Sequence, residues 1–217
     1  HKDGHRVPVH LSSSALDPEH PEEGVVFTAM ETGELHRARR DLQRANHILA
    51  GLNAWHRQVP TLAGREAVAG ALCRLLVERA GYREGWVGLV EDGERVRPLA
   101  RSPEDRDPAP LGEAAEGSDG VFGAAVRTGR PVTARHLDSD PVFAPWRDEA
   151  LARGVRAAAA LPLVHGDRVI GVLNLYSGEA TAFDPPEVAL LQEVAASLVD
   201  AMAHHNMADN DHDPPHV

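Results

Sequence analysis

Two polar side chains interrupt a stretch of sequence between residues 165 and 177 that is otherwise apolar after its opening turn. Asn174 and Tyr176 fall on one face of the strand predicted there, because side chains two residues apart in a strand point to the same side. A strand that is apolar on both faces is usually covered on both sides. The question is therefore which part of the protein, or which ligand, covers Asn174 and Tyr176. The opposite face is apolar throughout, and Gly171 on it would permit close approach of a helix.

Histidine and cysteine are the other residues that could do chemistry. His136 follows a short predicted strand and could ligate haem or a metal, or hydrogen-bond a ligand, although a single histidine in a loop is usually a surface polar group. His165 lies in a predicted turn and is expected to be exposed. Cys73 falls beside apolar positions of a predicted helix and is expected to be a small buried residue. No metal-site spacing relates the four histidines near the C-terminus, which are His204, His205, His212 and His216. We therefore expect no metal centre.

No catalytic set is visible in the sequence. It has no Walker-type glycine-rich loop, no kinase ATP lid, no Gly-Gly-acidic loop of a diguanylate cyclase and no Gly-x-Ser-x-Gly elbow. Asp138 and Asp140 are neighbours, but aspartate is common at the turn predicted there. We therefore expect that this chain is not an enzyme.

Composition limits the partners. The 217 residues carry a net charge of −11, which argues against nucleic acid or an anionic membrane as the main partner. No apolar run reaches the roughly 18 residues that a membrane span needs. A single cysteine excludes an internal disulfide and favours a cytoplasmic location. Because the sequence begins with His1, we expect a piece of a longer protein.

The N-terminal third contains two elements. A β-hairpin is predicted from the alternation at residues 7–12 and the apolar run at residues 25–30, with a turn-rich segment between them. A helix follows with a 3-4-3-4-3 spacing of apolar residues, at Leu35, Ala38, Leu42, Ala45, Leu49 and Leu52. This spacing favours a dimeric coiled coil over a helix packed only on its own domain. Pro60 is expected to end or break it.

From Arg65 to Ala203 the predicted order is helix, hairpin, loop, helix, strand, helix, hairpin and helix. The last helix has clean N-terminal chemistry, with Asp184 as N-cap, Pro185 next and Glu187 at the third position. A second seam-like face is predicted on it, formed by Val188, Leu191, Ala195, Leu198 and Met202.

This order and its motifs resemble the GAF domain. The match is best from Gly154-Val155 through Ala160-Leu161-Pro162-Leu163, then from Gly166 to Leu175, and on to Phe183-Asp184, Glu187 and Leu190-Leu191. Residues 1–32 resemble the C-terminal hairpin of a PAS domain, although they cover only half of that fold. The resemblance predicts four parts: the hairpin at residues 1–32, a coiled-coil helix at 33–59, a GAF domain at 60–204 and a polar, disordered tail at 205–217.

The resemblance implies an α+β fold, in which an antiparallel sheet has helices on one face and a small-molecule pocket on the other. The pocket is expected to be lined by Phe122, Val126, Phe143, Trp146, Val172, Asn174 and Tyr176. The ligand and any cofactor stay unidentified. A homodimer is expected through the two seams, at Leu35, Leu42, Leu49, Leu52, Leu191, Leu198 and Met202.

The function implied by the resemblance is the sensory and dimerisation region of a multidomain signalling protein. Its parent class stays open between a histidine kinase, a diguanylate cyclase and a phosphatase. The alternative is a structural GAF module whose own side chains fill the pocket, and which only dimerises and relays a PAS signal. Bilin attachment is disfavoured because Cys73 lacks a neighbouring histidine, and methionine sulfoxide reduction because it needs several cysteines. Cyclic-nucleotide binding is disfavoured because only Asn174, Phe183 and Asp184 match parts of the Asn-Lys…Phe…Asp-Glu pattern of GAF domains that bind cyclic nucleotides.

Overall fold

The structure is a computed structural model, and it describes residues 9–15, 24–31, 33–91, 95–104, 120–139 and 147–210. The chain divides into two compact units, His1–Arg44 and Ala45–Val217, and each is described by itself. The helix α1 (Gly33–Gln58) begins in the first unit and ends in the second. It ends just before Pro60, as predicted, because Pro60 lies in the short 3-10 turn Val59–Thr61.

The predicted N-terminal hairpin is present in the first unit. β1 (Val9–Ala15) pairs antiparallel with β2 (Val25–Glu31) in continuous register. Leu11 and Phe27 are 66% and 74% exposed, so the described residues leave large apolar side chains of this hairpin uncovered.

A five-stranded antiparallel sheet forms the centre of the second unit, with strand order β4-β3-β7-β6-β5. Antiparallel pairing follows from the two hairpins, β3–β4 and β6–β7, which the sequence predicts, and β3 joins them by pairing with β7. The strands are β3 (Glu84–Glu91), β4 (Arg95–Ser102), β5 (Val132–Arg135), β6 (Ala157–His165) and β7 (Arg168–Ser177).

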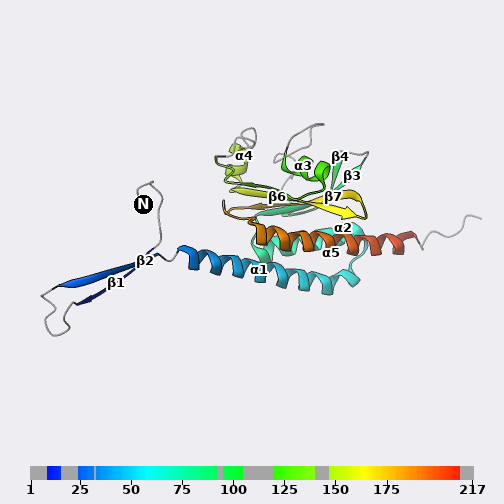
Figure 1. Ribbon diagram of the computed structural model, residues 1–217. Helices are drawn as coiled ribbons and strands as arrows, with labels where there is room; N and C mark the ends of the chain where they lie inside the picture. The colour runs from blue at the N-terminus through cyan, green and yellow to red at the C-terminus, as the bar shows by residue number, and fades with distance from the viewer. Residues whose placement is uncertain are drawn as a thin grey trace, which may run out of the picture. The chain divides into compact units, whose positions relative to one another are not determined.

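Helices cover both faces of this sheet (Figure 1). One face packs on α2 (Gly64–Ala80) and α5 (Pro185–Asn210), and its core includes Ile48 and Trp55 from α1. We call this the helix-side core. The other face carries α3 (Val121–Thr128) and α4 (Arg147–Ala152), which we call the α3-side cluster together with the strand residues beneath them.

The predicted division of β7 between two faces is confirmed in its second half. Leu173 and Leu175 are buried in the helix-side core, whereas Val172 and Tyr176 are buried in the α3-side cluster. The same alternation predicts that Val169 lies on the face of Gly171 and Leu173, and this prediction is wrong. Leu163 pairs with Gly171 and Val164 pairs with Val169, so β7 has one extra residue at Ile170. A bulge of this kind reverses the alternation, and Ile170, not Val169, packs against the helix-side core.

The element that approaches Gly171 closely is a neighbouring strand and not a helix. A Cβ atom on Gly171 would collide with the backbone oxygen of Gly88 in β3, which is the neighbouring strand. The close approach that we predicted is therefore real, but it lies within the sheet, and any larger residue would push β3 and β7 apart.

The start of α5 is as predicted, and its end is not. Asp184 Oδ1 accepts a hydrogen bond from the backbone N–H of Glu187 (2.9 Å), and Glu187 Oε2 accepts one from the N–H of Phe183 (2.7 Å). These bonds satisfy N–H groups that the first turn leaves open. The tail was predicted to be disordered from residue 205, but α5 continues to Asn210, and His205 Nε2 lies 3.0 Å from the carbonyl oxygen of Leu62.

Candidate functional site

The face of the sheet below α3 presents a row of side chains contributed by three strands. In the strand register Trp86 of β3 lies opposite Asn174 of β7, which in turn lies opposite Ala160 of β6. Tyr176 is flanked in the same way by Glu84 and Ala158. Cross-strand partners share a face, so aromatic and polar groups from β3 and β7 stand beside small alanines on β6.

α3 covers this row with an aromatic side chain. Phe122 is buried and meets Trp86 edge to face, with ring centroids 5.6 Å apart and planes at 78°. Such edge-to-face pairs are favourable beyond the apolar area that they bury. Gly129 ends α3 in the left-handed conformation, at φ 62°, which glycine adopts without strain.

Gly88 makes room for the Trp86 indole. A Cβ atom on Gly88 would lie 2.7 Å from Cζ3 of Trp86, so only a residue without a side chain fits beneath that ring. The indole therefore lies along β3 over Gly88.

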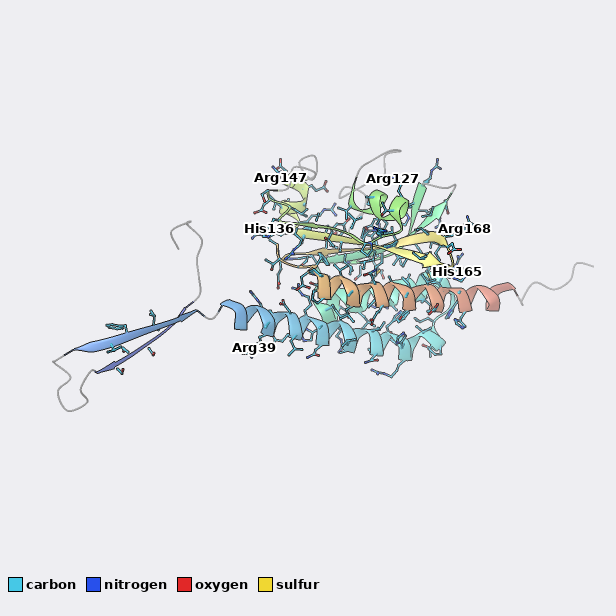
Figure 2. All side chains as sticks on the ribbon, in the orientation of Figure 1. Arg39, Arg127, His136, Arg147, His165 and Arg168 are labelled. Carbon is cyan, nitrogen blue, oxygen red and sulfur yellow. The ribbon has the colours of Figure 1, made fainter. Side chains whose placement is uncertain are left out.

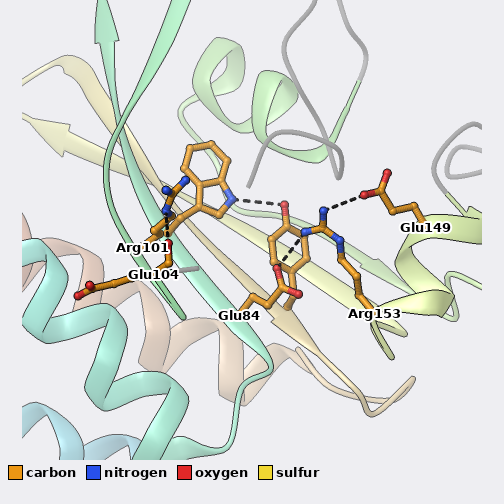
Figure 3. A network of polar contacts seen from close by, with 7 residues as sticks. Glu84, Arg101, Glu104, Glu149 and Arg153 are labelled. Carbon is orange, nitrogen blue, oxygen red and sulfur yellow. Dashed lines mark hydrogen bonds and ion pairs between the residues drawn. The ribbon is translucent and has the colours of Figure 1, made fainter. Parts of the chain in front are cut away.

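A polar network lines one end of the row (Figure 3). Trp86 Nε1 donates a hydrogen bond to Tyr176 Oη at 3.4 Å. Arg153 directly follows α4, and its Nη1 lies 3.4 Å from Glu84 Oε2 while its Nη2 lies 2.7 Å from Glu149 Oε1. Glu84 is only 4% exposed, so this pairing satisfies a charge within the fold. Figure 3 shows Arg153 reaching from α4 toward the Glu84 carboxylate on the sheet.

Burial keeps the Tyr176 phenol neutral. It raises the pKa of Tyr176 from 10.0 to about 12, although the hydrogen bond from Trp86 opposes that rise. The phenol therefore acts as a hydrogen-bonding group and not as a phenolate base at physiological pH.

Asn174 differs from the other polar side chains of this row in its hydrogen bonding. It is 3% exposed, and its Nδ2 is a buried polar atom with no hydrogen-bond partner among the described residues. Leaving a buried donor unsatisfied costs about 1–3 kcal/mol. Most buried polar groups in folded proteins are paired, so this amide donor is open to a group that the described residues do not supply.

Four of the seven predicted pocket residues come together on this face. Phe122, Val172 and Tyr176 belong to the α3-side cluster, and Asn174 lies between Val172 and Tyr176 on the same strand face. Val126 packs at the edge of that cluster and also lines a cavity at the end of the sheet. The predicted Phe143 and Trp146 lie outside the described residues.

The sequence interpretation missed Trp86, Glu84 and Arg153. Glu84 and Trp86 are two residues apart and therefore share a face of β3, but nothing in the sequence shows which face. Their position beside Tyr176 and Asn174 depends on the register between β3 and β7, two strands that are far apart in the chain.

The predicted dimer residues fall into two groups. Leu42 and Leu49 on α1 are 64% and 43% exposed. Leu52 instead packs against the helix-side core, and Leu35 lies in α1. The dimer face predicted on α5 is wrong. That face packs on α2 and the sheet of the same chain, and Leu191, Leu198 and Met202 are 0%, 0% and 2% exposed. A periodic apolar face does not say whether its partner lies in the same chain.

The remaining reactive side chains have no assembled site. Cys73 is fully buried, and burial raises its pKa from 9.0 to about 12, which disfavours the reactive thiolate. His136 is exposed in a turn at φ 56°. Within the described ranges, no three side chains of His, Cys, Asp or Glu gather in a way that could hold a metal ion. None of the helices in those ranges has the length and apolar character needed to cross a membrane.

Comparison with known proteins identifies the fold. The sequence model of the GAF domain matches residues 63–203. A solved structure of free methionine-R-sulfoxide reductase from Neisseria meningitidis, in complex with its substrate, has 21% identity and a TM-score of 0.63, covering 76% of this chain and 93% of that one. No curated protein matches the sequence.

Two further solved structures come from signalling proteins. The phycoerythrobilin-bound GAF domain of a cyanobacterial phytochrome has 15% identity and a TM-score of 0.58, covering 75% of this chain and 98% of that one. A domain of a putative two-component sensor histidine kinase from Sinorhizobium meliloti 1021 has 16% identity and a TM-score of 0.52, covering 69% and 97%. At these identities the similarity shows the shared fold.

Proposed function

The chain belongs to the GAF domain family, and on that premise we propose that it is a sensory module that binds a small molecule between the sheet and α3. The observation that carries this proposal is the buried Asn174 amide, whose Nδ2 has no hydrogen-bond partner in the part of the chain that the structure describes. Ligand pockets are mainly apolar, with a few well-placed polar groups that fix orientation. Asn174 among Trp86, Phe122 and Val172 fits that description.

The position of the amide indicates the kind of ligand. An Nδ2 donor needs a hydrogen-bond acceptor, such as a carbonyl or carboxylate oxygen. The Trp86 indole lies next to it in the register and offers a flat apolar surface. A small, largely apolar molecule with one acceptor group suits both features. Two of the similar structures hold a bound molecule, phycoerythrobilin in one and the enzyme's substrate in the other, which supports a binding role for a domain of this fold.

NMR of the indole N–H groups of Trp86 and Trp55, two of the three tryptophans, tests ligand binding. Trp86 is the reporter, and Trp55 is the internal control because its Nε1 donates to the carbonyl oxygen of Val68 within the helix-side core. We expect a ligand found by thermal-shift screening of small carboxylates and ketones to move the Trp86 signal and not the Trp55 signal. The Asn174→Leu variant should lose that response. A ligand that stabilises the protein but leaves the Trp86 signal in place would contradict this site.

The alternative function is a ligand-free module that dimerises and relays a signal. The packing of Phe122 on Trp86, and the hydrogen bond from Trp86 to Tyr176, favour it because they already fill part of this face. Under that alternative no small molecule would move the Trp86 indole signal.

Reduction of methionine sulfoxide, the activity named for one similar structure, is not part of the proposal. The chain has one cysteine, and Cys73 is buried with a raised pKa. Turnover of free methionine sulfoxide by the purified chain, with a dithiol reductant, would overturn this part.

Dimerisation through α1 is the relay element of the proposal. Leu42 and Leu49 are spaced by one heptad and are exposed in the single chain. A second α1 packed against them would bury both. The N-terminal hairpin, with Leu11 and Phe27 exposed, is proposed to be the end of a PAS-like sheet. The whole module is proposed to act in the cytoplasm.

A further inference from the structure

A cavity lies at the end of the sheet, and Asn174 is not among the residues that line it. It has a volume of about 610 Å³, within the range of small-molecule sites. Its apolar floor is formed by Leu89 of β3, Ile170 of β7, and Val199 and Met202 of α5. Three basic side chains stand around it: Arg65 at the start of α2, and His165 and Arg168 at the turn between β6 and β7. Figure 2 shows His165 and Arg168 together at that end of the sheet.

The bulge in β7 decides how two of its side chains meet this cavity. Ile170 is the extra residue, so Val169 and Ile170 lie on the opposite faces from those that unbroken alternation would give, and both line the cavity. Val169 lies next to Gly129 at the end of α3, where a Cβ atom on that glycine would be 3.6 Å from Val169 Cγ2. Ile170 packs against the helix-side core. Bulges commonly occur next to functional sites because they redirect side chains.

The charge around the cavity is opposite to that of the chain. The whole sequence has 33 acidic and 22 basic residues, yet among the described residues no Asp or Glu lines this cavity. Arg65, His165 and Arg168 are exposed, and within the described part of the chain neither arginine forms an ion pair. A local positive potential above an apolar floor attracts a molecule that is anionic at one end and apolar at the other.

We propose that this cavity binds an amphiphilic anion, with its apolar body on the floor and its carboxylate or phosphate between Arg65 and Arg168. Arginine is suited to both of these acid groups because its planar guanidinium presents paired donors. The bound molecule touches α5 through Val199 and Met202 and the sheet through Ile170, so it bridges two elements of the GAF domain. This site does not depend on the Asn174 site and goes beyond the proposed function.

The Met202 methyl group gives a direct readout. Met202 is 2% exposed and lines the cavity, whereas Met30 lies in β2 of the other unit. With the methionine methyl groups labelled, decanoate below its micelle concentration is expected to shift the Met202 signal in a saturable way and to leave Met30 unchanged. Decanol and inorganic phosphate, each lacking one half of the ligand, are expected to shift it much less.

Charge-removing variants complete the test. Arg65→Gln and Arg168→Gln should each weaken decanoate binding, and the double variant should weaken it about tenfold or more, because charged hydrogen bonds are lost. Arg74→Gln is the matched control: this arginine is also exposed and on α2, but it lines a different groove. Since all three side chains are exposed, the thermal stability of the variants should match that of the parent chain.

Four outcomes would overturn the proposal. They are decanol binding as tightly as decanoate, unchanged decanoate affinity in the double variant, equal loss of affinity in Arg74→Gln, and no saturable shift of Met202. Vesicles containing phosphatidylglycerol separate a free amphiphile from a membrane surface. Binding to vesicles without a response of Met202 to decanoate would assign the arginines to a membrane and would reject this site.

Discussion

Replacing Asn174 by leucine should make the ligand-free protein more stable. The side chain is 3% exposed and its Nδ2 has no partner among the described residues, so the folded state carries the cost of an unsatisfied donor, about 1–3 kcal/mol. Leucine removes that cost and buries a more apolar side chain with the same number of heavy atoms. Its methyl groups are bulkier than the planar amide, and repacking around them is expected to cost about 1 kcal/mol, the lower end for overpacking.

The net expectation for Asn174→Leu is a gain of about 1 kcal/mol in the free energy of unfolding. For a domain of this size, such a gain raises Tm by about 2–4 °C. Chemical denaturation of the ligand-free protein, followed by circular dichroism, measures the change directly. The same variant should lose the Trp86 response to ligand, so stability and binding should change in opposite directions, as expected where function opposes stability.

Ser177→Ala is the matched control. Ser177 is also in β7 and is 2% exposed, but its Oγ accepts a hydrogen bond from the N–H of Glu179 at 3.1 Å. Removing this acceptor should lower stability by about 1 kcal/mol. If Asn174→Leu lowered stability as Ser177→Ala does, the Asn174 amide would have a partner in the folded chain, and the reasoning that assigns it to a ligand would be refuted.

Three further predictions concern the helices and the buried phenol. Leu42→Glu with Leu49→Glu should convert a dimer into a monomer in light scattering without changing the circular dichroism of the fold, since both side chains are exposed in the single chain; a parent chain that is already monomeric would contradict the α1 dimer. Leu198→Ala should lower stability by about 2–5 kcal/mol in chemical denaturation, because Leu198 is fully buried in the helix-side core, and a loss of only a few tenths would be inconsistent with that packing. Tyr176 has a raised pKa in the folded state, so its stabilising contribution is complete below pH 10 and is lost as the pH rises toward 12. Tyr176→Phe should therefore flatten the fall of stability in that range, and an unchanged slope would place the titration elsewhere.

Local signals predicted the elements of this fold well. The N-cap at Asp184, the helix stop before Pro60 and the hairpins follow from residues within a few positions of one another. The two faces of β7 near Leu173 and Tyr176 also follow from simple alternation.

Local sequence patterns could not predict the interactions between segments that are far apart in the chain. The bulge at Ile170 arises in the pairing of β6 with β7, and it moved Val169 to the other face. The same limit applies to α5, where Leu191 and Leu198 repeat like a coiled-coil seam but pack on α2 of the same chain. At the candidate site, Asn174 and Tyr176 were visible as polar interruptions, whereas Trp86 joined them only through the register of β3 with β7.

The depth of Asn174 has a kinetic consequence. With only 3% of the side chain exposed, a molecule cannot reach the amide unless the cover above the sheet first opens. β7 lies in the middle of the five strands and is hydrogen-bonded on both sides, whereas α3 is only eight residues long. The opening step therefore belongs to the cover and not to the sheet. The observed rate of ligand association should level off at high ligand concentration, at the rate at which the cover opens. The sheet would then set which molecule is held, and the cover would set how quickly the signal begins and ends.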